Sequence, residues 1–182
     1  MAELHFIGDI TCGYGFGGNS FFCVFEIVYG TQWKVVEGRT SGCTHIMSQL
    51  DTEVPWNFPI DIHFTCTGMQ GWPKVSVQVW QVDAYGRKDI AGYGMTYLPM
   101  PGHGEQEVEI LTWRPTYWHP SFFMRLYESM RLFFMGGIPV LRDNALIHGN
   151  EERFKLHTIG SGTVKLKLNI ISRGFKQTGM LF

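Results

Sequence analysis

The sequence predicts an all-β protein, an antiparallel β-sandwich with one inserted helix near residues 121–135. Three observations predict this fold class: many short stretches of alternating apolar and polar residues, a 15% share of aromatic residues, and a single apolar stripe with helical spacing. Alternation places every second side chain on the same face of a strand. Because no repeat or break in composition divides the 182 residues, we expect a single domain over residues 1–182.

Alternating stretches predict the strands. Residues 60–66 alternate between apolar and polar side chains, and residues 163–170 do so even more regularly. In the latter stretch Lys165 and Lys167 face outward between apolar positions. A turn at Gly71-Trp72-Pro73 precedes a further alternating run. The expected strands are residues 4–10, 20–28, 32–36, 43–47, 60–66, 74–78, 93–98, 107–111 and 163–170.

The one expected helix covers residues 121–135. Pro120 and Ser121 suit a helix start, and the pair Gly136-Gly137 suits its end. Two interpretations of its apolar stripe stay open: it packs onto an edge or end of the sheet, or it docks onto a partner protein. The stripe residues that would contact a partner are Phe122, Leu126, Phe133 and Phe134.

Composition argues against some classes of function. The net charge is −1, whereas a duplex-binding protein needs a positive surface to replace counterions, so we expect no nucleic-acid partner. The four cysteines form no Cys-x-x-Cys pair. No apolar run approaches the roughly 18 residues of a membrane span, and the start of the chain lacks a signal-peptide pattern. We therefore expect a cytoplasmic protein with free thiols.

A glycine-rich segment follows the first expected strand. Gly13, Gly15 and Gly18 match the spacing Gly-x-Gly-x-x-Gly of dinucleotide-binding sites. Such a site requires a helix immediately after the glycines, whose N-terminus holds the pyrophosphate. Residues 20–28 are instead rich in β-branched and aromatic side chains and predict a buried strand. The glycines are therefore interpreted as a flexible connection between two strands.

Residues 81–89 form an expected polar loop. Residues 79–92 resemble a calcium loop of C2 domains, but Gln81 stands at the first ligand position, which leaves Asp83 and Asp89. Residues 18–23 resemble the other calcium loop of that family, with Phe21 where an aspartate would stand. Calcium needs several anionic oxygens to replace its water shell, so we expect no metal site and a polar turn instead.

No residue pattern indicates catalysis. The seven histidines show no metal-ligand spacing, and the chain has no nucleophile elbow, phosphate-binding loop or His-Glu-x-x-His motif. We therefore expect neither an enzyme nor a cofactor.

Several motifs in a fixed order resemble the B9-domain family over essentially the whole chain. They are Gly68-Met-Gln-Gly-Trp-Pro73, Val79-Trp80, Asp83-x-x-Gly86-Arg87, Ala91-Gly92-Tyr93-Gly94, Thr112-Trp-Arg-Pro115, Leu156-His-Thr158 and Gly162-Thr-Val164. The resemblance implies a C2-like β-sandwich. It also implies a role in the Meckel syndrome complex at the ciliary transition zone, beside the basal body, in ciliogenesis and in gating entry to the cilium. The implied partners are other B9-domain proteins and membrane subunits of the transition zone.

Two hypotheses about function follow. The first is a non-enzymatic scaffold that binds related B9 domains through Trp72, the apolar stripe of residues 121–135 and exposed sheet edges that are available for strand addition. The alternative is calcium-independent binding to anionic lipid through a basic surface near the last strand, although alternation alone explains two of its lysines. The candidate lipid-binding residues are Lys155, Lys165, Lys167 and Arg173.

Overall fold

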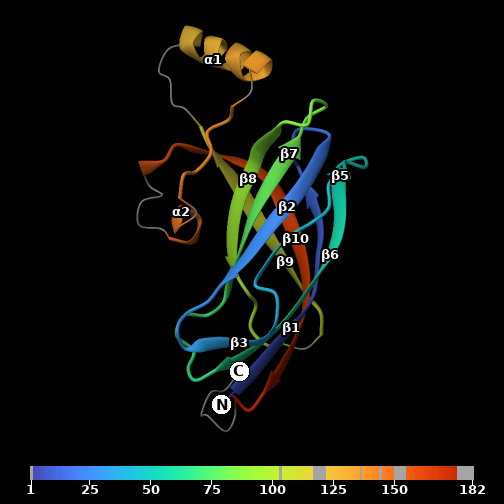
Figure 1. Cartoon of the computed structure of the whole chain (residues 1–182), viewed down its shortest axis with the longest axis vertical. Coiled ribbons are helices and arrows are strands. Elements are labelled where there is room, and N and C mark those ends of the chain that lie inside the picture. The colour runs from blue at the N-terminus through green and yellow to red at the C-terminus, as the bar shows by residue number, and fades with distance from the viewer. Residues whose placement is uncertain are drawn as a thin grey trace.

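Antiparallel strands dominate the protein. The computed structural model describes residues 2–102, 104–116, 122–135, 137–143, 145–149 and 155–175. Within these ranges ten strands form one sheet in the order β3-β6-β1-β10-β9-β8-β7-β2-β4, with β5 paired to β2 (Figure 1). The elements are β1 (Ala2–Tyr14), β2 (Ser20–Val28), β3 (Trp33–Gly38), β4 (Ser41–Cys43), β5 (Met47–Ser48), β6 (Glu53–Cys66), β7 (Lys74–Val82), β8 (Lys88–Tyr97), β9 (Gln106–Pro115), α1 (Phe122–Met135), α2 (Ala145–His148) and β10 (Thr158–Arg173).

The sheet curls so that its two halves face each other. The β1 half (β3-β6-β1-β10-β9) and the β2 half (β8-β7-β2-β4) join at a short ladder that pairs Tyr93 with Trp113 and Gly94 with Thr112. A Cβ on Gly94 would stand 2.7 Å from the Cγ2 atom of Ile110, so glycine permits the close approach of β8 and β9. One core cluster contains buried side chains from both halves. The predicted all-β, C2-like class with an inserted helix is confirmed.

The buried faces follow the predicted alternation. In β6, the side chains of Ile60, Ile62 and Phe64 are buried, and in β7 those of Val75 and Val77 are completely buried. Burial of an aliphatic side chain of this size stabilises a fold by about 1.5–3 kcal/mol. These inward rows therefore account for much of the adhesion between the two halves.

A second, smaller cluster lies on the outer face of β8. Ile90, Tyr93 and Trp113 pack there with Ile147 of α2. The hydroxyl of Tyr93 accepts a hydrogen bond from the backbone N–H of Leu141 at 3.1 Å. The segment after α1 thus covers the outside of the joint between the two halves. No helix in the described ranges is long and apolar enough to cross a membrane.

Two local expectations were wrong. Residues 43–47 do not form one strand, because β4 ends at Cys43 and β5 begins at Met47. Between them, the buried hydroxyl of Thr44 accepts a hydrogen bond from the N–H of Cys23 at 2.9 Å and so replaces a ladder bond. The loop expected over residues 81–89 is shorter, since β7 extends to Val82 and β8 begins at Lys88. The short helix α2 was not predicted.

One strand edge is protected by proline. β6 pairs with β1 over its whole length, but β3 covers it only from Ile62 to Cys66. The remaining edge contains Pro55 and Pro59, which have no N–H to donate. Proline on an exposed edge reduces pairing with another chain, so this edge is poorly suited to strand addition.

Candidate functional site

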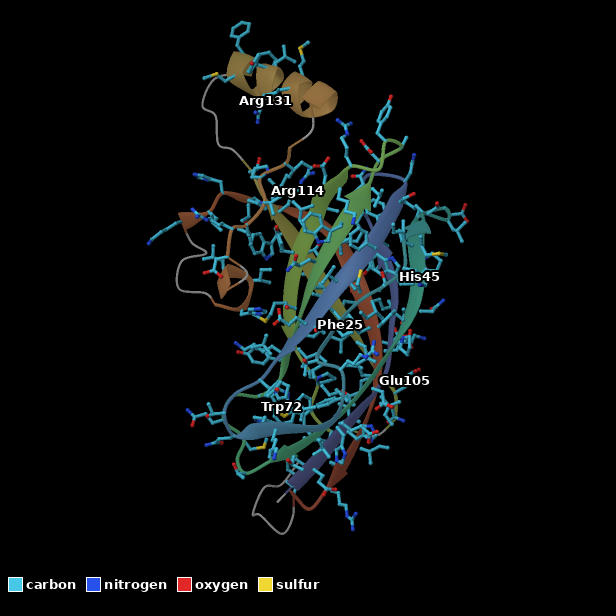
Figure 2. The ribbon with its side chains drawn as sticks, in the orientation of Figure 1. Phe25, His45, Trp72, Glu105, Arg114 and Arg131 are labelled. Atoms are coloured by element: carbon cyan, nitrogen blue, oxygen red, sulfur yellow. The ribbon has the colours of Figure 1, made fainter. Side chains whose placement is uncertain are left out.

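Helix α1 presents apolar side chains to solvent. Phe122 is 71% exposed and Phe123 is 79% exposed, and more than half of the Leu126 side chain is exposed as well. Figure 1 shows α1 beyond the end of the sheet, and Figure 2 shows side chains of α1 projecting away from the sheet. Within the described part of α1, the stripe therefore does not pack onto the sheet as one interpretation expected. The side chains of Phe133 and Phe134 lie outside what the structure describes.

Trp72 has a packing role. Its indole N–H donates to the carbonyl oxygen of Leu98 at 2.6 Å, and its ring meets the ring of Trp33 edge-on at 5.1 Å between centroids. Both contacts tie the turn before β7 to the core, and the side chain is half-buried. Contact between Trp72 and a partner protein stays a prediction.

The hairpin between β7 and β8 is organised by Asp83. Its Oδ1 atom accepts hydrogen bonds from the N–H groups of Tyr85 and Arg87 at 2.8 Å each, and its Oδ2 atom accepts from Nε of Arg87 at 2.6 Å. Gly86 adopts a positive φ of 79°, as this type of tight turn requires. Desolvation raises the pKa of Asp83, but the hydrogen bonds from Arg87 and from the backbone outweigh it and hold the pKa below its ordinary value.

The two loops that resemble calcium loops do meet. Residues 18–20 and 81–84 line a shared hollow of about 360 Å³. Its one carboxylate is Asp83, which is already bound to the guanidinium of Arg87, while Gln81 and Asp89 are paired residues of β7 and β8. Across the described ranges, no group of three or more His, Cys, Asp or Glu side chains could hold a metal ion. Arg87 thus supplies the positive charge that a cation would bring to Asp83.

Acid should weaken this hairpin. The pKa of Asp83 is lower in the folded protein than in the unfolded chain. The stability that the carboxylate contributes is therefore fully present at pH values above its pKa in the unfolded chain, and it is lost as the pH falls through its pKa in the folded protein. We expect the melting temperature to decrease when the pH drops below about 4. The variant Asp83→Asn should show a smaller decrease over the same pH range. Thermal melts over this range would check it. Asp51→Asn is the control, since Asp51 makes no ion pair with any described residue, and equal pH dependence in all three proteins would contradict the assignment.

The candidate lipid-binding surface carries its own counter-charge. Glu107 lies 3.3 Å from Nζ of Lys167 and 3.7 Å from Nζ of Lys165. The hydrogen bond from Lys167 is the main cause that lowers the pKa of Glu107. Lys155 and Arg173 are exposed. Lipid binding by these four residues stays a prediction, although pairing with Glu107 reduces the positive charge that an anionic membrane would meet.

Another hollow, of about 640 Å³, lies between β4 and β6. It contains His5, whose Nε2 atom lies 2.6 Å from Oδ1 of Asp61, and Cys43. Desolvation raises the pKa of the Cys43 thiol, which donates to the carbonyl oxygen of Thr44 at 3.3 Å. A thiol with a raised pKa is a poor nucleophile at neutral pH. This hollow therefore gives no support to catalysis by Cys43.

A polar hollow at the end of the sandwich was missed by the sequence analysis. We call it the mouth hollow; its volume is about 250 Å³. The signal for it is a polar residue at the end of a row of core-facing positions, such as Arg114 after Ile110 and Thr112 in β9. The residues that line it are Gly15, Gly17, Gln81, Ala91, Arg114, Gly160 and Ser161.

Comparison with known proteins identifies the family. The profile of the family described as "Ciliary basal body-associated, B9 protein" matches residues 4–171. The chain belongs to the B9-domain family. It is 41% identical to B9 domain-containing protein 2 of Danio rerio and 36% identical to that of Homo sapiens, in each case over 99% of both chains. It is also 27% identical to B9 domain-containing protein 1 of Xenopus laevis, over 87% of this chain and 78% of the relative.

The motifs of this B9 protein have structural reasons. Gly71, with a φ of 75°, accepts a hydrogen bond from the N–H of Gly30 at 2.9 Å. A Cβ on Gly71 would stand 2.6 Å from Cα of Gly30, so the turn before Trp72 requires glycine. Tyr93 and Trp113 lie at the joint of the two halves, with ring centroids 5.6 Å apart. These parts of the B9 signature therefore encode the fold rather than a reacting site.

Proposed function

We propose that this B9 protein is a non-enzymatic structural subunit at the base of the cilium. In this role it binds other B9-domain proteins of the Meckel syndrome complex, beside membrane proteins of the transition zone, and supports ciliogenesis and gating. The family description supports an association with the ciliary basal body. The similarity to two kinds of B9 domain-containing protein supports binding among B9 domains.

The observation that carries the proposal is the exposed apolar stripe of α1. Large apolar side chains cover one side of this helix and are exposed by more than half: Phe122, Phe123, Leu126, Tyr127 and Met130. They recur at helical spacing, which is how a helix presents anchors to a hydrophobic groove. Contiguous exposed apolar surface of this kind marks an interaction site. The helix lies beyond the sheet, where a partner can reach it without disturbing the core (Figure 1).

Co-purification with two other B9-domain proteins of the same organism tests the proposal. The wild type should form a complex, and Phe122→Ser combined with Leu126→Ser should weaken it at least about 30-fold, since buried aromatic anchors contribute about 2 kcal/mol or more. Both replaced side chains are exposed, so the melting temperature should not fall.

The matched control is Tyr85→Ser, which removes an aromatic ring that is 87% exposed in the β7–β8 hairpin. This variant should bind like the wild type. A wild-type protein that stays monomeric and binds neither relative would overturn the proposed function. A double variant with unchanged affinity would show instead that α1 is not the contact surface.

A further inference from the structure

The mouth hollow contains a cation without a partner. Arg114 is half-buried and pairs with Ile159 through its backbone, but its guanidinium makes no hydrogen bond or ion pair with any described residue. No acidic side chain lines the hollow. Keeping a guanidinium partly out of water without a counter-charge is unfavourable, so the site is suited to an anion.

Two inward-facing rows end at this hollow in polar donors. In β9 the row of Ile110 and Thr112 continues to Arg114, and in β7 the row that includes Val79 continues to Gln81. If the residues at positions 114 and 81 were apolar, they would simply continue the hydrophobic core. Polar residues at intended core positions are a recurrent mark of functional sites.

Glycines make the rest of the hollow accessible. A Cβ built on Gly17 or Gly160 would meet no atom within 4 Å, and neither residue has a positive φ. No backbone conformation requires glycine at these two positions. The empty space beside them leaves their backbone groups open to a ligand. Backbone groups of glycine-rich turns and the planar donors of arginine together recognise phosphate oxygens.

We propose that the mouth hollow binds the phosphate group of a phosphomonoester through Arg114, with Gln81 as a second donor. A volume of about 250 Å³ accommodates a phosphate and part of the group that carries it. The phosphate belongs either to a soluble inositol phosphate or to the headgroup of a phosphorylated inositol lipid. This binding goes beyond the proposed partner contact, because α1 takes no part in it.

Calorimetry with inorganic phosphate and a soluble inositol phosphate tests the site on the full chain. Arg114→Gln should weaken binding about tenfold or more, the usual effect of losing a charge-assisted hydrogen bond. Its melting temperature should stay the same or rise, because an unpaired half-buried cation is removed; a merely structural arginine would lower it. Gly160→Asp places a carboxylate in open space and should abolish binding. Arg39→Gln, at an exposed position outside the mouth hollow, is the control and should bind like the wild type.

Vesicle sedimentation identifies the source of the phosphate. Phosphatidylcholine vesicles with a phosphorylated inositol lipid are compared with vesicles that contain phosphatidylserine. If the protein is retained only on the vesicles with the phosphorylated inositol lipid, the phosphate belongs to a lipid headgroup. If its affinity for the soluble inositol phosphate equals its affinity for these vesicles, the ligand is a free inositol phosphate. No saturable binding of any probe, or an Arg114→Gln variant within twofold of the wild type, overturns the site. The site is also overturned if only the double variant Lys165→Glu, Lys167→Glu loses binding. That result would place the phosphate on the candidate lipid-binding surface instead. The Phe122 and Leu126 variant should keep phosphate binding, so the two proposals fail separately.

Discussion

Trp56→Ala should lower the free energy of unfolding by about 3–5 kcal/mol, the usual effect of removing a fully buried aromatic side chain. Trp56 is 1% exposed and lies in β6 of the β1 half. Its indole N–H donates to the carbonyl oxygen of Phe21 in the β2 half at 3.2 Å. A Cβ on Gly13 would stand 2.6 Å from the indole ring, so the ring fills the space that glycine leaves. The two halves are thus held together at this point by one side chain.

Urea unfolding and thermal melts measure this effect. For a chain of this size the melting temperature should fall by about 10 °C or more. Trp56→Phe keeps most of the packing and loses the hydrogen bond, so its loss of stability should be smaller. Tyr85→Ala, at an exposed aromatic position, should change stability by no more than about 0.5 kcal/mol. If Trp56→Ala were as stable as Tyr85→Ala, the role of Trp56 in joining the halves would be refuted.

Gly8→Ala should destabilise the protein by roughly 3 kcal/mol, at the upper end of overpacking substitutions. Gly8 lies in β1, between β6 and β10, opposite Ile60 and Leu168. A Cβ at this position would overlap the carbonyl oxygen of Lys167, and backbone on a central strand cannot move aside as a flexible side chain can. We expect the change in denaturant midpoint to exceed that of any surface variant.

Gly17→Ala is the matched control for Gly8→Ala. A Cβ on Gly17 meets no atom within 4 Å, and its φ is not positive. Its stability should equal that of the wild type or rise slightly, because alanine restricts the unfolded chain. Equal midpoints for both variants would show that β1 and β10 are not in close contact at Gly8.

The sequence predicted the regular parts of the fold because burial imposes a period of two on them. β2 begins and ends at the residues expected, and the inward row of residues 60–66 is buried throughout. Tertiary contacts decided the rest. A single side-chain bond from Thr44 interrupts the strand expected over residues 43–47, and no local pattern reveals its partner Cys23. The four residues of α2 are too few to show helical periodicity.

The candidate sites were predictable only where they form a stripe on one element. The apolar side of α1 is readable at helical spacing, but whether it faces the sheet or solvent depends on where the chain places the helix. The mouth hollow joins residues far apart in sequence, such as Gly17, Arg114 and Gly160. Its signal in the sequence is a polar residue at the end of a row of inward-facing positions in a strand. That signal becomes specific only when the structure shows that the rows of β7 and β9 end at the same place.

Asp83 and Arg87 have a consequence for regulation. In a loop that depends on a dissociable ion, occupancy follows the concentration of that ion, and the loop can act as a sensor. Here the positive charge is covalently tethered four residues from its carboxylate, at 2.6 Å. Its effective concentration is set by the hairpin and does not change with the surroundings. The ion pair that organises the β7–β8 hairpin therefore does not depend on the concentration of a dissolved cation.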